Sequence, residues 1–332
     1  FIDFPFQTNI HQLEKQEFID CLYDLFNKEE KDKYDNFLDM LYGKFGKSIV
    51  EKFLKPYNEK LYAVDLTKLD VDAMGRFFPY ADKEAIINNM KNSKVNSYNA
   101  SFLYPRNGAA SFIDILYNEL DKSKVLLNTS VVSLDLNNKE AKLSNGETVK
   151  YEYLINTMPL NNFLKLIGGH DELLNEMSYN KVLVFNLGFD KASPLCKKEH
   201  WLYIPSKNCN YYRVGFYNNI LGDEKLSMYI EIGYNKDTKI TKEEIDKQLD
   251  LTLKNLRESG IISDDMKLVD HETIIMDPAY VHIETETTKK IDDLKNEFSK
   301  KGVYTIGRYG AWIYNSMEDS MVKAKELAEK LR

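Results

Sequence analysis

The stretch 125–159, VLLNTSVVSLDLNNKEAKLSNGETVKYEYLINTMP, shapes the interpretation of the whole chain. Apolar and polar residues alternate through most of it, which is typical of β-strands with one buried face. Asn145-Gly146 is a turn signal, and the last apolar run delivers Thr157 and Pro159 to a helical pattern. The stretch predicts a β-meander, and a plain antiparallel hairpin is the simpler alternative from periodicity alone.

The chain closes with a second informative connection. The β-branched run 303–306 predicts a strand that ends at Gly307-Arg308, and Ser316 then opens a helix. A glycine at a strand end permits close approach to the backbone, and a helix N-terminus offers free N–H groups to phosphates or electron-rich rings. A capping box between Ser316 and Asp319 explains the same residues without a ligand.

Around these two stretches the chain mixes helices and strands without repeats. Residues 1–10 predict a strand that leads into a helical layer at 11–62, and a helix is expected at about 107–121. Further strands are predicted at 181–190, 201–205, 211–217, 226–234 and 268–276, and polar-faced helices at 241–258 and 287–300.

Length and charge narrow the classes of function. With 332 residues and 43% hydrophobic residues, the chain can form one or two domains. Its net charge of −7 and the absence of long Lys/Arg runs argue against a nucleic-acid or anionic-membrane partner. No apolar stretch reaches the roughly 18 residues of a membrane span, so none is predicted.

The three cysteines and five histidines show no metal-ligand spacing, and no metal site is predicted. The odd number of cysteines, Cys21, Cys196 and Cys209, suits a reducing compartment, which favours a cytoplasmic location.

A glycine-rich phosphate fingerprint is missing. The sequence contains no G-x-G-x-x-G, and GKFGKS at 43–48 lacks the spacing of a phosphate loop and lies within a helical pattern. We interpret it as a loop or an irregularity of the helix.

The order of the meander, Thr157-Met158-Pro159 and the terminal strand-Gly-Arg-helix resembles the FAD-dependent oxidoreductases of the amine oxidase and UDP-galactopyranose mutase superfamily. The resemblance implies a mixed α/β (α+β) fold with a Rossmann-like FAD region built from discontinuous segments and a helical plus antiparallel-sheet substrate domain. The expected division is 1–105 helical layer, 106–160 FAD region, 161–286 mixed-sheet substrate domain and 287–332 return to the FAD region. The family's glycine-rich βαβ unit would precede Phe1, so weak FAD binding is expected of these 332 residues alone.

Several stretches are similar to the mutases of this superfamily. In KPYNEKLY and NYYRVGFYNN the resemblance assigns uracil binding to Tyr57 and Tyr62 and diphosphate contact to Arg213. It makes Tyr314 a substrate-side residue that acts with Arg213 in catalysis. The positions implied to contact the flavin are Val131, Thr157, Pro159, Gly307, Arg308, Met317 and Glu318.

Two departures from the family pattern bear on the substrate. The second diphosphate arginine has two candidates, Arg76 in MGRFFPYADKEAI and Arg106 in YPRNG, and Ser316 stands where the family often has an acid. Each assignment also has a structural alternative. The tyrosines could pack in the core, and Arg213 could form a salt bridge.

The resemblance implies an enzyme that interconverts pyranose and furanose forms of a nucleotide sugar through reduced FAD, in the cytoplasmic synthesis of cell-surface polysaccharides. One alternative is an amine oxidase-type FAD oxidoreductase, and another is a non-catalytic nucleotide-sugar-binding protein. The predicted partner is a small molecule, and the helical layer could serve as an interface in a homo-oligomer.

Overall fold

In the computed structural model, which describes residues 1–92 and 101–332, the strand near the C-terminus pairs with the last strand of the predicted meander region. Strand β10 (Val303–Thr305) lies parallel to β4 (Leu154–Asn156), with Tyr304 opposite Ile155. The prediction that these two distant segments belong to one region is confirmed.

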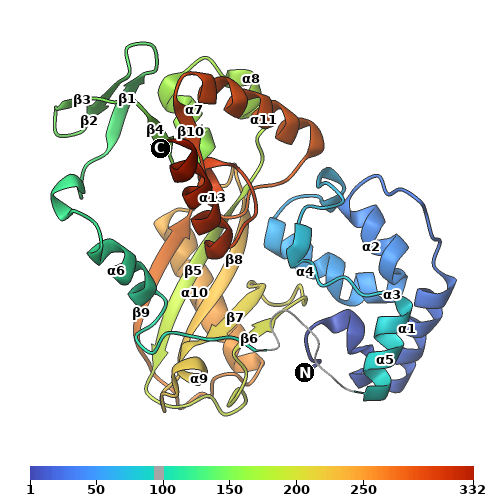
Figure 1. Ribbon diagram of the computed structural model, residues 1–332. Helices are drawn as coiled ribbons and strands as arrows, with labels where there is room; N and C mark the ends of the chain where they lie inside the picture. The colour runs from blue at the N-terminus through green and yellow to red at the C-terminus, as the bar shows by residue number, and fades with distance from the viewer. Residues whose placement is uncertain (93–100) are drawn as a thin grey trace. The chain divides into compact units, whose positions relative to one another are not determined.

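The chain divides into two units, and each is built from two separate segments (Figure 1). Unit 1 contains residues 1–108 and 180–279, and unit 2 contains residues 109–179 and 280–332. The divisions therefore follow residues 108, 179 and 279, where the sequence placed them after 105, 160 and 286. The mixed fold assembled from discontinuous segments agrees with the predicted fold class.

Strands β1, β2 and β3 of unit 2 form an antiparallel sheet in that order. The turn between β2 and β3 contains Gly146 at φ 91°, a conformation that glycine adopts without strain. The predicted meander is therefore correct for three strands but not for the fourth, because β4 leaves this sheet for β10. The bounds are β1 Val131–Asp135, β2 Glu140–Leu143 and β3 Thr148–Lys150.

The helices of unit 2 pack with the β4–β10 pair in an apolar core. Leu160 and Phe163 of the helix after β4 pack with Phe298 of the helix before β10 and with Val303 of β10 itself. All four side chains are at most 5% exposed, so this core fixes the end of each strand. The helices are α6 Ala110–Asn118, α7 Leu160–Ile167, α8 Asp171–Glu176, α11 Thr285–Lys300, α12 Gly307–Gly310 and α13 Met317–Lys330.

Unit 1 contains an antiparallel sheet of five strands in the order β6-β7-β8-β5-β9. Buried residues alternate along β5, as its period-two pattern predicts, and Leu249, Leu253 and Leu256 of α10 pack on the same core. All five predicted strands are present, and β6 and β7 are shorter than predicted. The five strands are β5 Asn180–Phe189, β6 Trp201–Tyr203, β7 Arg213–Phe216, β8 Ser227–Asn235 and β9 Leu268–Met276.

The helical layer predicted at 11–62 is present in unit 1. Its helices are α1 Lys15–Asn27, α2 Phe37–Phe45, α3 Lys47–Ile49, the π-helical turn η3 Val50–Leu54 and α4 Lys55–Tyr62. The stretch GKFGKS forms the junction of α2 and α3, where Gly46 has φ 75° and Ser48 binds the carboxylate of Asp24 through its N–H and hydroxyl. It is thus the helix irregularity that the sequence suggested. The remaining helices of this unit are α5 Lys83–Asn92, α9 Tyr217–Leu221 and α10 Lys242–Glu258.

The strand predicted over residues 1–10 is wrong. This segment contains 3₁₀ turns at Phe6–Thr8 and Ile10–Gln12. Pro5 has no N–H to offer a sheet, and its carbonyl accepts hydrogen bonds from the Thr8 hydroxyl and the Asn9 amide, so local bonding replaces a strand ladder.

Candidate functional site

Four of the predicted cofactor residues lie at one end of the β4–β10 pair in unit 2. Thr157 follows β4, Pro159 precedes α7, and Gly307 and Arg308 begin α12 directly after β10. The Ile306 N–H donates to the carbonyl of Asn156, 3.0 Å away, which joins the two strand ends. The carboxyl ends of parallel strands are where ligands of α/β folds gather.

The two glycines of α12 lie in different surroundings. Gly307 adopts φ 78°, and a Cβ built there would meet nothing within 4 Å, so the space beside it is open. Gly310 is enclosed, since a Cβ there would lie 2.6 Å from the carbonyl oxygen of Asn156 and 3.2 Å from Cα of Thr157. Gly310 therefore allows α12 to rest on β4, and Gly307 leaves room for another group.

Arg308 is surrounded by tyrosines. The centre of its guanidinium lies 4.4 Å from the ring centroid of Tyr314, 5.2 Å from that of Tyr280 and 5.9 Å from that of Tyr309. Its Nη1 donates to the carbonyl of Asn315 at 3.2 Å. No carboxylate in the described ranges forms an ion pair with Arg308, so its charge is held by aromatic faces and one carbonyl.

The N-terminus of α13 carries the capping box that the sequence offered as an alternative. The Asp319 carboxylate accepts from the N–H of Ser316 at 2.8 Å, and the Ser316 hydroxyl accepts from the N–H of Asp319 at 3.2 Å. The predicted flavin contacts Met317 and Glu318 are exposed at this same end. The cap accounts for the start of the helix and leaves both residues at the surface.

Trp312 was not identified from the sequence. It adopts φ 56°, which is uncommon for a large side chain, and is 3% exposed, with its ring 5.8 Å from that of Tyr179. Its Nε1 is buried and has no hydrogen-bond partner among the residues that the structure describes. A non-glycine residue held at positive φ is a feature of functional sites, and only the backbone geometry reveals it.

A second cluster of predicted residues lies in unit 1. The ring of Tyr57 stacks on Phe53, with centroids 5.4 Å apart and planes at 6°, and meets Tyr203 edge-on at 5.1 Å. Phe53 also stacks on Phe6, at 4.9 Å. A pocket of about 370 Å³ is lined by residues 1–4, Phe6, Phe53, Glu199 and 201–205. Tyr57 therefore supports two rings of the pocket wall, Phe53 and Tyr203.

Arg213 lies beside this pocket but is paired. Its Nη1 is 3.3 Å from Oε1 of Glu231, and its guanidinium centre lies 5.3 Å from the centroid of Tyr203. The Tyr212 hydroxyl also donates to Glu231, at 2.5 Å. Burial raises the pKa of the neighbouring Tyr229 to about 12, so that hydroxyl stays neutral beside the Arg213–Glu231 pair. The salt bridge considered from the sequence exists, in a half-buried setting.

Lys60, which the sequence did not single out, holds this cluster together. Its ammonium donates to the carbonyls of Ile204 and Ser206, both at 2.9 Å, and to the carbonyl of Tyr211. These carbonyls belong to the connection between β6 and β7, whereas Lys60 is on α4 with Tyr57. Burial lowers the pKa of the Lys60 amine to about 8.

The other predicted site residues lie apart from these two clusters. Tyr62 is 2% exposed and packs edge-on against Phe37 in the core, at 6.3 Å. Arg106 is exposed in the turn before α6, and Val131 is 36% exposed at the start of β1. The side chain of Arg76 lies outside the described part of the structure.

Within residues 1–92 and 101–332, no group of three or more His, Cys, Asp or Glu side chains is placed to hold a metal ion. In the same ranges, no helix has the length and apolar character that crossing a bilayer requires.

Comparison with known proteins gives a consistent picture. The family model described as "flavin containing amine oxidoreductase" matches residues 7–281. A crystal structure of reduced UDP-galactopyranose mutase is 24% identical, with a TM-score of 0.89 over 100% of this chain and 76% of that chain. A putative protoporphyrinogen oxidase from Exiguobacterium sp. 255-15 is 15% identical, with a TM-score of 0.72 over 98% of this chain and 75% of that one. A fatty acid isomerase from P. acnes that produces CLA is 11% identical, with a TM-score of 0.56 over 94% of this chain and 73% of that one.

Proposed function

Because the chain belongs to the flavin-containing amine oxidoreductase family, we propose that it is a FAD-dependent enzyme that interconverts the pyranose and furanose forms of a nucleotide sugar. The observation that carries this proposal is the aromatic and arginine cluster of unit 1, Phe53, Tyr57, Tyr203 and Arg213, beside a pocket of about 370 Å³. The likeness to a reduced UDP-galactopyranose mutase supports the choice of substrate.

The residues at the β4–β10 end fit a flavin. A flavin dinucleotide carries phosphates, and its reduced ring carries negative charge, so it needs a cation that is not already neutralised. Arg308 meets this requirement, since no carboxylate of the described residues pairs with it, and the open side of Gly307 leaves room. We propose that Arg308 and Gly307 hold the cofactor, with Thr157, Pro159, Met317 and Glu318 near it and Val131 as an outer contact.

When bound, reduced FAD would supply a nucleophilic nitrogen for the anomeric carbon of the sugar. The protein must then bind the nucleotide and stabilise the departing diphosphate. We propose that Phe53 and Tyr203 contact the uracil and that Tyr57 keeps both rings in place. Tyr62 supports the same helix from the core, against Phe37.

Arg213 is the proposed diphosphate ligand, with Arg76 or Arg106 as the second. Its fork of N–H groups suits two phosphate oxygens, and stabilising the negative charge of the leaving diphosphate lowers the barrier. Glu231 has to share or release Arg213 when the diphosphate arrives, and its second bond to Tyr212 keeps the carboxylate in place during that exchange. Tyr314, which covers Arg308, is proposed as the substrate-side tyrosine.

A second candidate is an oxidation of amine or apolar substrates with hydride transfer to FAD. The carboxylate on Arg213 favours it, because a neutralised arginine is a poor receptor for a diphosphate. The pocket wall is also largely aromatic, with Phe4, Phe6, Phe53 and Tyr203. The description of the family as amine oxidoreductases names oxidation, so the activity assay has to distinguish oxidation from isomerisation.

The test is to incubate the protein and FAD with UDP-galactofuranose, with and without dithionite, and to separate the products by chromatography. Formation of the pyranose only after reduction would support the proposal. Reoxidation of substrate-reduced flavin with release of hydrogen peroxide would support the oxidoreductase. A UDP titration that is positive while no flavin absorption appears would support the non-catalytic nucleotide-sugar-binding protein. We also propose a cytoplasmic location and a homo-oligomer. Cell fractionation tests the location, and light scattering tests the oligomeric state.

A further inference from the structure

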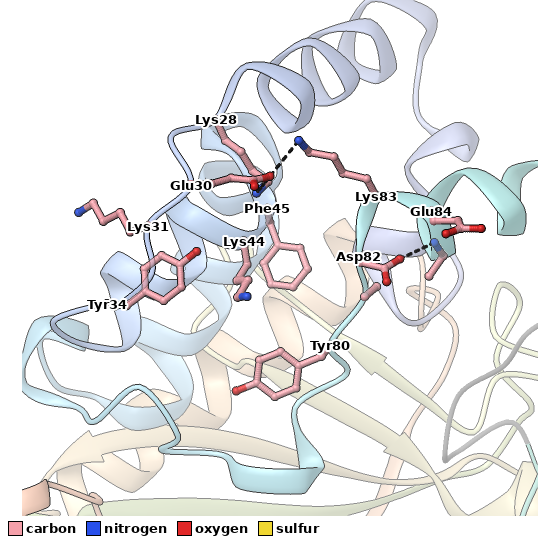
Figure 2. Close-up of a pocket in the computed structure, with 12 residues that line it drawn as sticks. Lys28, Glu30, Lys31, Tyr34, Lys44, Phe45, Tyr80, Asp82, Lys83 and Glu84 are labelled. Atoms are coloured by element: carbon pink, nitrogen blue, oxygen red, sulfur yellow. Dashed lines mark hydrogen bonds and ion pairs between the residues drawn. The ribbon is translucent and has the colours of Figure 1, made fainter.

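The helical layer of unit 1 contains a second pocket that the proposed function does not use. It measures about 660 Å³, within the roughly 300–1,000 Å³ of small-molecule sites. Its wall comes from the connection between α1 and α2, the end of α2, and residues 80–85 at the start of α5 (Figure 2). The pocket of about 370 Å³ has an entirely different set of lining residues.

Four lysines from three segments line this pocket, in a chain whose net charge is −7. Lys28 and Lys83 both reach the same oxygen of Glu30, at 3.0 Å each, as the dashed lines in Figure 2 show. These two ammonium groups hold the pKa of Glu30 at about 2. One carboxylate thus serves two cations, and a positive charge is left over.

Lys44 packs against an aromatic ring of this wall. Its Nζ lies 5.6 Å from the ring centroid of Tyr34, and no carboxylate within residues 1–92 and 101–332 forms an ion pair with it. Lys31 is neutralised by Asp39 at 2.8 Å. The pocket wall also contains two further acids, Asp82 and Glu84, and Asp82 accepts from the N–H of Ala85 at 2.7 Å while keeping its charge.

The wall shows signs of a built site. The Lys28 side chain is only 7% exposed, and its ammonium also donates to the carbonyl of Gly43 at 2.8 Å. Gly43 lies inside α2, where glycine weakens a helix, yet any Cβ there would overlap the ring of Tyr34. The glycine thus seats Tyr34 on the helix backbone. Tyr80 is 48% exposed and meets Phe78 edge-on at 4.8 Å.

From this combination we infer that the pocket binds a small molecule that joins an anionic phosphate or carboxylate group to a flat ring. The amines of Lys28, Lys44 and Lys83 would receive the anionic group, with Glu30 as the partner it displaces or shares. Tyr80 and Tyr34 would contact the ring. Binding here would be independent of the flavin and of UDP, because the lining residues do not include those of either proposed site.

The test is calorimetric titration of the whole chain at low ionic strength with phenyl phosphate, benzoate and inorganic phosphate. We expect one of the two ring-bearing anions to bind more tightly than inorganic phosphate, and the better one identifies the head group. Lys44→Gln should weaken that ligand about two- to fivefold, as expected for an exposed charge pair. Tyr80→Ala should weaken it by a similar factor or up to about tenfold, and should leave inorganic phosphate unaffected.

Lys15→Gln is the matched control. It removes the same charge from an exposed lysine at the other end of α1, about 20 Å of helix away. Equal weakening by Lys15→Gln and Lys44→Gln would show general charge attraction and overturn the inference. No heat with any of the three anions, or inorganic phosphate binding as tightly as phenyl phosphate and benzoate, would also overturn it. Both exposed lysine variants should keep the circular dichroism spectrum of the wild type.

Discussion

Arg213 of unit 1 and Arg308 of unit 2 were predicted as ligands of anions, but the structure places them in opposite surroundings. Arg213 is paired with Glu231 at 3.3 Å and lies over the ring of Tyr203. Arg308 is enclosed by three tyrosine rings and bonds to a carbonyl, with no ion pair in the described ranges.

The difference concerns what each arginine must give up to bind an anion. An anion at Arg213 competes with a carboxylate already in place, so binding there is exchangeable, as a substrate requires. An anion at Arg308 competes only with water and a carbonyl, so binding there can be long-lived, as a cofactor requires. The different partners of the two arginines therefore support the proposal that Arg213 binds substrate and Arg308 binds the cofactor.

The largest expected effect is that of Arg308→Ala on flavin binding. Loss of a charge-assisted hydrogen bond costs about 1.5–3 kcal/mol, so FAD affinity should fall about ten- to a hundredfold. Flavin fluorescence titration measures it, and Arg308→Lys should recover part of the loss. Arg213→Ala is the comparison variant and should keep wild-type FAD affinity. An equal loss in both variants would remove the distinction between the two arginines.

Next in size is the effect of Tyr57→Ala on UDP binding. Tyr57 supports Phe53 and Tyr203, so its removal should weaken UDP by about 1–3 kcal/mol, the range for one stacked base. Tyr62→Ala should lower the melting temperature with little effect on UDP affinity, because its ring packs against Phe37. Calorimetry and thermal unfolding measure the two properties, and FAD content should not change in either variant. A larger affinity loss in Tyr62→Ala would reverse these roles.

A smaller change is expected from Glu231→Gln. Removing the carboxylate frees Arg213 for the diphosphate, and UDP should bind about two- to fivefold more tightly, since one partly exposed ion pair is removed. Glu244→Gln, which removes another tyrosine-bonded carboxylate of the same unit, should have no effect. Weaker UDP binding in Glu231→Gln would mean that the carboxylate orients Arg213 rather than competing for it.

The smallest effect concerns Lys60 and pH. Burial lowers the pKa of its amine from 10.5 to about 8 in the folded protein, so between these values the unfolded chain binds more protons than the folded chain. Its contribution to stability therefore rises with pH across that window. Urea unfolding at several pH values should therefore show a more favourable change of stability with rising pH in the wild type than in Lys60→Met, because the raised pKa values of Cys21 and Tyr229 act in the opposite direction in both proteins. Parallel pH dependences would mean that Lys60 titrates as an exposed lysine does.

The strands could be predicted where apolar and polar residues alternate along the sequence. Alternation located β5, β8 and the meander, and Asn145-Gly146 marked a turn, because these signals are local. The pairing of β4 with β10 could be expected only from family resemblance, since no local signal chooses a partner so distant along the chain. The prediction of a strand at residues 1–10 was wrong because it gave apolar spacing more weight than Pro5. The Pro5 carbonyl accepts hydrogen bonds from Thr8 and Asn9.

The site residues were predicted less completely for a similar reason. The family resemblance suggested Arg213 and Arg308, but their partners Glu231 and Tyr280 are distant in sequence, and only the fold brings them together. Gly310 and Trp312 carry no sequence signal, because a close backbone approach and a positive φ are properties of coordinates.

Because β4 pairs with β10, it is synthesised long before the strand that completes its pairing. Strand β4 leaves the ribosome roughly 150 residues before its partner, a delay of about 10–30 s at the usual rate of elongation. During that interval its backbone edge and the apolar face of α7 lack the cover that β10 and α11 later give them. An unpaired strand edge of this kind can associate with other chains. We therefore expect correct folding to depend on chaperones, or on aggregation being slow, more than the finished fold suggests.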